Sequence, residues 1–154
     1  MSLLGRAVYA SLLWKERRAG ARRRDVGGRR ETGRRGERLA YWFLRRAGYV
    51  VVGRNLRLRP GSGELDLVAW DGPVLAFVEV KTRTGEESGP PETALGPRQQ
   101  ERIVRAAHDY LTRLKRKAVN YRFDIVSVGW NPEEGFRLKL IKNAFSGAPT
   151  GGSS

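Results

Sequence analysis

The sequence predicts one α/β domain in which a mixed central sheet is flanked by helices. Two segments repeat their apolar residues every three or four positions, as amphipathic helices do, and shorter runs are rich in β-branched and aromatic residues. The length of 154 residues fits one domain with tails better than two domains with separate cores. The chain has no cysteine, which excludes a disulfide scaffold, a thiol nucleophile and a cysteine-ligated metal.

The expected domain begins with a helix and a strand. Apolar residues follow the helical spacing through Gly36–Ala47, and Gly48 supplies the stop. Tyr49–Val52 is a short apolar and β-branched run, which predicts the first strand. A loop rich in glycine and proline follows at Pro60–Gly63.

A hairpin is expected next. Glu64–Trp70 and Val74–Arg83 have the character of strands, and the Asp71-Gly72 pair between them is a strong hairpin signal. Loops of two and of four residues at this place give the same register. That register makes Asp66 a diagonal neighbour of Glu79 across the two strands.

One helix and two strands complete the prediction. Pro97 suits the first turn of a helix that runs to about Lys117 and has one apolar face. Arg122–Val128 and Phe136–Ile141 then predict two further strands. The order of one helix, three strands, one helix and two strands implies a mixed sheet with helices packed on it.

The chain is strongly basic. Lysine and arginine number 30 against 16 aspartates and glutamates, a net charge of +14, which predicts a polyanionic partner such as nucleic acid. Residues 1–35 hold 11 basic and 3 acidic side chains, a net +8. We expect residues 1–35 to be a flexible basic arm, 36–145 the folded domain and 146–154 a flexible tail. The alternative interpretation of the arm is a solvated extension without a ligand. The basic residues expected to contact phosphates are Arg22, Arg23, Arg24, Arg29, Arg30, Arg34, Arg35, Lys115, Arg116 and Lys117.

The N-terminus lacks the order of a secretory signal, because Arg6 interrupts its apolar stretch and basic residues follow. No apolar run approaches the roughly 18–20 residues of a membrane span. We therefore expect a cytoplasmic protein. Leu3–Trp14 is expected to form a short amphipathic helix, either docked on the domain or lying on a surface.

Charged side chains gather on the expected hairpin. Glu64 and Asp66 share one face of their strand, because side chains alternate along a strand. Glu79 and Lys81 share one face of the next strand, and the hairpin register brings the two faces together. Carboxylates crowded among apolar strands repel one another, and a hard divalent cation, Mg²⁺ or Mn²⁺, would relieve that repulsion. A metal beside a lysine is the equipment for phosphodiester hydrolysis. The alternative is a solvated sheet face with ordinary ion pairs.

An acidic residue on one strand, followed by Glu79-Val80-Lys81 on the next, is a known nuclease pattern. The segments that accompany it in order are Gly36-Glu37, Gly48-Tyr49, Arg54–Arg57, Gly63–Val68, Phe77–Arg83, Arg122–Val126 and Asn143–Phe145. Together they resemble the PD-(D/E)XK nuclease superfamily, which includes restriction endonucleases and Holliday-junction resolvases. Within it they resemble most closely the YraN family of bacterial proteins.

This resemblance implies a restriction-endonuclease-like fold and a metal-dependent nuclease. It makes Asp66 and Glu79 metal ligands and Lys81 the residue that positions or activates water. Glu37 would be an acidic residue supplied by the first helix, or else a first-turn glutamate favoured by the helix dipole. Glu64 would orient a ligand or contact the metal through water.

The second long helix departs from the family pattern. In the family this helix tends to begin with a Lys-Gln pair, whereas here it reads Gln99-Gln100. Gln100 shares a helix face with Ile103 and Ala107, so we expect it to reach the site as a neutral hydrogen-bonding group. The loss of the lysine removes a cation that could bind phosphate at position 99.

Two further polar residues are expected to be structural. Asp124 shares a strand face with Arg122, which predicts an ion pair between them. His108, the single histidine, is expected at the boundary between the core and the solvent.

Three functions follow from these patterns. The first is a Mg²⁺- or Mn²⁺-dependent nuclease-like enzyme that acts on nucleic acid, with DNA favoured over RNA and a branched or structured substrate. The second is a non-catalytic nucleic-acid-binding module on a nuclease fold. The third is an accessory protein that binds polyanions through its basic arm. The sequence leaves a homodimer open.

Overall fold

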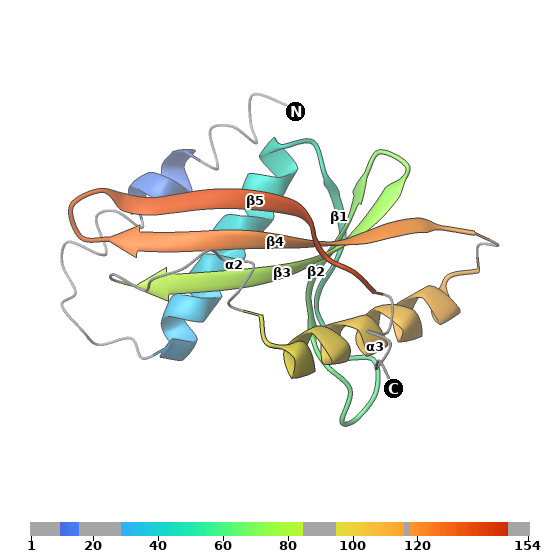
Figure 1. The fold of residues 1–154 in the computed structure, drawn as a ribbon. Helices are drawn as coiled ribbons and strands as arrows, with labels where there is room; N and C mark the ends of the chain where they lie inside the picture. Colours follow the sequence, from blue (N-terminus) through green and yellow to red (C-terminus); the bar gives the residue numbers. More distant parts are fainter. Residues whose placement is uncertain (1–9, 16–28, 85–94, 116–117, 148–154) are drawn as a thin grey trace.

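The computed structural model describes residues 10–15, 29–84, 95–115 and 118–147. Its order of elements is the expected one: a helix, three strands, a helix and two strands. Several elements extend beyond the predicted ends, because strand pairing continues past the most apolar residues (Figure 1). The elements are α2 (Arg29–Arg46), β1 (Val50–Leu56), β2 (Leu65–Asp71), β3 (Val74–Thr84), α3 (Pro97–Arg113), β4 (Asn120–Asn131) and β5 (Gly135–Phe145).

The five strands form one mixed sheet in the order β1-β2-β3-β4-β5. All neighbouring pairs are antiparallel except β3 and β4, which are parallel. A parallel pair needs a crossover connection, and α3 supplies it between β3 and β4. The predicted α/β class, with a mixed sheet flanked by helices, is therefore confirmed.

Each face of the sheet has its own apolar core. Alternate residues of β3 separate the two cores: Ala76 and Val78 pack with α2, whereas Leu75 and Phe77 pack with α3. The buried residues of the α2 core are Leu39, Ala40, Leu44, Tyr49, Leu67, Ala69, Ala76, Val78, Val126 and Val128. Those of the α3 core are Leu65, Val68, Leu75, Phe77, Leu95, Ile103, Ala106, Ala107, Phe123 and Ile125.

Helix α2 begins seven residues earlier than the sequence predicts. Residues 29–35, which we assigned to the basic arm, form its first turns, where Glu31 and Arg35 make an ion pair 3.5 Å long. The helix dipole interacts favourably with an acidic residue in the first turn, Glu31, and with Arg45 and Arg46 in the last turn, which stabilises the helix. The rest of the arm is described only at residues 10–15, which are helical and pack Leu13 against the α2 core. This contact favours the docked form of the expected N-terminal helix.

The β2–β3 turn lies one residue later than predicted. Asp71 pairs with Val74, and the turn consists of Gly72, at φ 56°, and Pro73, which has no N–H to lose from the ladder. The register is thereby shifted by two residues, so the side chains keep the predicted faces. Continued past the last pair, this register brings Asp66 level with Glu79 instead of diagonal to it.

Candidate functional site

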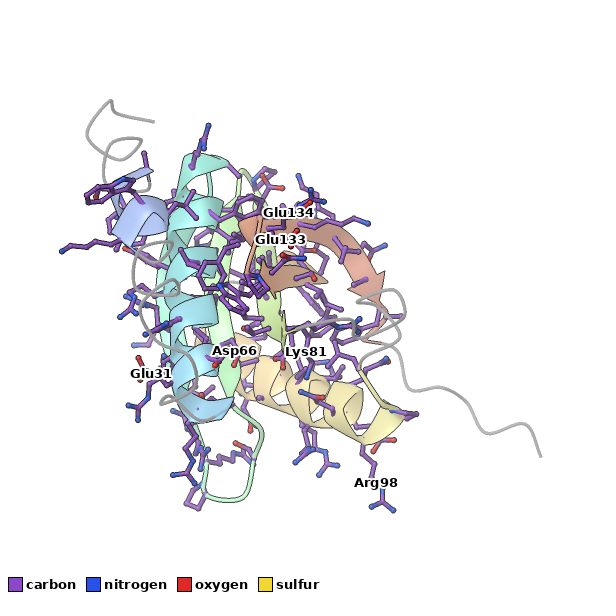
Figure 2. The ribbon with its side chains drawn as sticks, turned by 90° about the vertical axis from the view of Figure 1, so that its left-hand side faces the viewer. Glu31, Asp66, Lys81, Arg98, Glu133 and Glu134 are labelled. Carbon is purple, nitrogen blue, oxygen red and sulfur yellow. The ribbon has the colours of Figure 1, made fainter. Side chains whose placement is uncertain are left out.

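The site lies where β2 and β3 separate. Their ladder ends at the pair Leu67 and Val78, and beyond it the N–H of Val80 donates a hydrogen bond of 2.8 Å to Oδ2 of Asp66. The carboxylate of Asp66 thus replaces the backbone carbonyl that the departing strand no longer offers. Figure 2 shows Asp66 between α2 and α3, with Lys81 beside it over α3.

Three carboxylates from three segments meet at this point. Glu37 comes from α2, Glu64 from the loop before β2 and Asp66 from β2, and each offers an oxygen within 4.8 Å of the others. Gly36 allows this approach, because a Cβ there would clash with the hydroxyl of Thr82 on β3. Glu37 lies in the middle of α2, so the alternative of a first-turn glutamate is wrong.

Glu79 lies on the other side of Asp66, together with a lysine and a glutamine. Glu79 is 7% exposed and shares a hydrogen bond with Asp66. The amide nitrogen of Gln99 donates to Oε1 of Glu79 over 2.9 Å, and Lys81 Nζ donates to Oε1 of Gln99 over 3.1 Å. Lys81 Nζ is also 3.8 Å from the same Glu79 oxygen. Gln99 therefore links the carboxylate and the ammonium group.

Negative charge is in excess at the site. Burial raises the pKa of Asp66, and it raises the pKa of Glu79 further because the charge of Asp66 adds to the burial. Burial, followed by the charges of Asp66 and Glu64, also raises the pKa of Glu37. Burial is thus the largest cause of all three raised pKa values, and the charges of neighbouring carboxylates add to it.

Asn55 was not among the sequence-predicted residues. It lies near the end of β1 with φ at 47°, a conformation that asparagine tolerates better than most residues, and its side chain hydrogen-bonds Glu37. That hydrogen bond lowers the pKa of Glu37 and thus opposes the effect of burial. The sequence signal for this role was an asparagine, Asn55, within the Arg54–Arg57 segment that the family resemblance includes.

A cleft of about 430 Å³ opens in front of these carboxylates. Its far wall is the loop before β2, which is held on α3: a Cβ at Gly63 would be 2.7 Å from the carbonyl oxygen of Arg102. At the mouth, Arg57 forms an ion pair of 3.2 Å with Glu64. The lining residues are Arg57, Gly61, Ser62, Gly63, Glu64, Asp66, Glu79, Gln99, Arg102 and Ile103.

The hydrogen bond to the site that the sequence predicts for Gln100 is made by Gln99 instead. The amide of Gln100 donates to the carbonyl oxygen of Leu95 over 3.0 Å and is engaged at the start of α3, whereas Gln99 reaches Glu79. Both residues lie on faces compatible with the apolar stripe, and the packing of α3 on the sheet selects Gln99. The prediction for Gln100 is therefore corrected.

The predicted phosphate contacts are only partly described. Arg30 and Arg34 are exposed on α2, Arg35 is paired with Glu31, and Lys115 is exposed after α3. Residues 22–24 and 116–117 lie outside the described residues, as does the side chain of Arg29.

Of the two residues expected to be structural, Asp124 has the predicted surroundings, whereas His108 is exposed instead of lying at the boundary of the core. Asp124 is fully buried and accepts hydrogen bonds of 2.9 and 3.1 Å from Nε of Arg122, which confirms the predicted ion pair. His108 is exposed on α3, with its ring edge-on to that of Tyr121.

A mixed sheet between two helices, with carboxylates and a lysine where two central strands separate, is consistent with the restriction-endonuclease-like fold. The model of the uncharacterised protein family UPF0102 matches residues 36–128, and the chain belongs to this family, which is the YraN family. The matched segment contains Glu37, Glu64, Asp66, Glu79 and Lys81 and ends within β4.

Individual relatives agree with the family assignment. The chain is 47% identical over 116 residues to the UPF0102 protein of Symbiobacterium thermophilum, covering 75% of this chain and 97% of the relative. It is 52% identical over 96 residues to the protein of Solibacter usitatus, covering 62% and 73%. It is 43% identical over 114 residues to that of Syntrophus aciditrophicus, covering 74% and 87%.

The part of the chain that the structure describes contains no helix both long enough and apolar enough to cross a membrane.

Proposed function

We propose that this protein is a metal-dependent nuclease that hydrolyses phosphodiester bonds in nucleic acid, with DNA as the favoured substrate. The observation that supports it most is the gathering of Glu37, Glu64 and Asp66 around one point, at a cleft where the pKa values of Glu37 and Asp66 are raised. A cytoplasmic location, where the DNA would be met, is part of the proposal.

The donor set fits Mg²⁺ or Mn²⁺. Both cations prefer hard oxygen ligands, and a few carboxylates that leave room for water and a substrate phosphate are typical of their nuclease and polymerase sites. Asp66 would hold the ion together with Glu37 or Glu64, and Glu79 would be a further ligand from the other side of Asp66. When bound, such an ion supplies positive charge that stabilises the developing charge on phosphorus and acidifies a bound water.

The chain's own residues would then orient the attack. Lys81 carries a positive charge to the mouth of the site, where it can hold a water or a non-bridging phosphate oxygen. Gln99 fixes Lys81 and Glu79 relative to each other through its two hydrogen bonds. Because Gln99 is neutral, it holds the ammonium group in place without attracting it away from a phosphate.

The test is a cleavage screen on branched, duplex and single-stranded DNA and on RNA, with Mg²⁺ or Mn²⁺. Asp66→Asn and Lys81→Ala should remove cleavage, whereas Glu133→Gln should not. Glu133 is an exposed carboxylate at the β4–β5 turn, away from the cleft (Figure 2). Cleavage that survives in Asp66→Asn would overturn the proposed site. Binding of nucleic acid without any cleavage would favour the alternative, a binding module on a nuclease fold.

A further inference from the structure

The outward face of α3 carries a row of arginines. Arg98, Arg102 and Arg105 follow one another at intervals of four and three residues, so they lie on one side of the helix, beside its buried face. All three are exposed, and Figure 2 shows Arg98 pointing away from the body of the molecule. None of the three side chains forms an ion pair or a hydrogen bond with another residue in the described part of the chain.

This row continues into the cleft. Arg102 lines the cleft, and Arg57 lines it from the loop before β2. The loop is fastened to α3 at two further places: Arg113 donates to the carbonyl oxygen of Leu58 over 2.8 Å, and Arg59 pairs with Asp109 over 3.2 Å. Loop and helix therefore present one surface. We name it the α3 basic face and define it by Arg57, Arg98, Arg102 and Arg105.

Acidic side chains on this face are few and mostly engaged. Asp109 is paired with Arg59, and Glu64 at the mouth of the cleft is paired with Arg57. Glu101 is the remaining carboxylate among the described residues between Arg98 and Arg105. The face thus keeps an excess of guanidinium groups directly beside a cleft that holds an excess of carboxylates.

We propose that the α3 basic face binds the phosphodiester backbone of the nucleic acid on which the cleft acts, and in this it rests on the proposed function. Guanidinium groups suit phosphate oxygens, which they can bind through two parallel hydrogen bonds. From Arg98 to Arg105 the helix rises about 10 Å. One strand of a duplex presents about three phosphates over that length of its axis. The surface assigned here is distinct from the basic arm.

The proposal explains why opposite charges adjoin at the cleft. A carboxylate cluster repels a polyanion, so an approaching strand needs cations next to the cluster to hold it there. Arg57 and Arg102 flank the carboxylates, and from Arg102 the row extends along α3 to Arg98 on one side and to Arg105 on the other. The strand would therefore run along α3, with the phosphate to be cut placed in the cleft.

The test compares two variants of equal net charge. Arg98→Gln/Arg105→Gln removes two cations from the α3 basic face without touching the cleft. Arg137→Gln/Lys139→Gln removes two exposed cations from β5 near the β4–β5 turn, away from α3 in Figure 1. Binding of the full chain to a labelled duplex is measured over a salt titration with EDTA present, so that cleavage plays no part.

We expect the α3 variant to flatten the slope of log affinity against log salt by about 1.8, because each phosphate contact contributes about 0.9 on duplex DNA. The β5 variant should leave the slope close to that of the wild type. Arg102→Gln alone should flatten it by about 0.9. Equal losses in the two double variants, or a wild type that does not bind at low salt, would overturn the proposal.

The readouts separate this inference from the proposed function. A selective loss of binding in the α3 variant, in a protein that cuts nothing, would support the basic face and count against the nuclease. Metal-dependent cleavage by wild type, with no selective effect of the α3 variant on binding, would support the nuclease and overturn the basic face.

Discussion

Two groups of carboxylates lie on this sheet, and their negative charges are balanced in different ways. The first surrounds Asp124 on the α2 side. Its oxygens accept hydrogen bonds from Arg122, from the backbone N–H of Asn143 at 2.9 Å and from the hydroxyl of Tyr49 at 3.3 Å. Arg122 also bonds Asp71 over 2.6 Å, and Lys142 Nζ bonds Asp71 over 2.9 Å. We refer to this group as the Asp124 network.

The pKa values of the carboxylates are shifted in opposite directions in the two groups. In the Asp124 network the hydrogen bonds of Arg122 and Lys142 lower the pKa of Asp71, so the negative charges are matched within the chain. At the cleft, burial raises the pKa of Asp66 and Glu79, the charge of Glu64 adds to the rise at Asp66 and that of Asp66 to the rise at Glu79, and Lys81 offsets this only in part. Buried charge that the protein satisfies itself supports the fold, whereas buried charge left unsatisfied indicates a ligand.

The largest expected effect concerns cleavage. Asp66→Asn and Lys81→Ala should each lower the cleavage rate by at least about 10²–10³-fold, the loss found when one group that stabilises a transition state is removed. Unfolding midpoints of both variants should stay near that of the wild type. Asp71→Asn is the matched change in the Asp124 network, and its cleavage at saturating DNA should equal that of the wild type. A similar loss in Asp71→Asn would remove the distinction between the two groups.

The next effect concerns stability. Asp124→Ala leaves Arg122 half-buried without its main partner and should cost about 3–5 kcal/mol of unfolding free energy, as removal of one member of a buried ion pair does. Glu79→Gln should cost far less, because the amide cannot take up the buried charge whose cost raises the pKa of Glu79, and it can keep the hydrogen bond to Asp66. Urea unfolding with a chelator present measures both. Equal destabilisation would show that the two groups do not differ in the way described.

Metal binding gives the third comparison. Mg²⁺ or Mn²⁺ should raise the unfolding midpoint of the wild type, since a ligand at 100 times its dissociation constant stabilises the folded state by about 2.7 kcal/mol. The double variant Asp66→Ala/Glu79→Ala should show no shift. Asp71→Asn should shift as the wild type does. A thermal melt without a metal-dependent shift in wild type would contradict the metal site.

The smallest effect is a difference in pH dependence without metal. The raised pKa values of Asp66 and Glu79 mean that the folded chain keeps protons which the unfolded chain loses above about pH 4. Their contribution to stability is therefore full below that pH and is lost as the pH rises toward the raised values. Glu79→Gln should flatten this decline, which chemical unfolding measured at a series of pH values would show.

The contribution of Asp71 to stability should change with pH in the opposite direction. Its lowered pKa stabilises the folded state above about pH 4, and this contribution is lost as the pH falls through the folded-state value. The destabilisation caused by Asp71→Asn should therefore shrink on acidification. A cost of Asp71→Asn that is constant with pH would show that its ion pairs with Arg122 and Lys142 contribute nothing.

The sequence by itself determined the order of the elements and the faces of the strands. Alternation along a strand is local and fixed at a period of two, so the pairing of Arg122 with Asp124 could be predicted without a tertiary structure. The same rule put Glu79 and Lys81 together, which the ion-pair distance of 3.8 Å bears out. The motifs also gave the family, because they occur in order along the chain.

Only the tertiary structure determined which residues of different helices and strands come into contact. The shift of the hairpin register came from the conformation of Gly72 and Pro73, and it made Asp66 level with Glu79. Adjacent residues on a helix point about 100° apart, so the seating of α3, and not the sequence pattern, chose Gln99 over Gln100. The approach of Glu37 to Asp66 likewise depends on how closely α2 packs on β3, a contact between surfaces that are distant in the sequence.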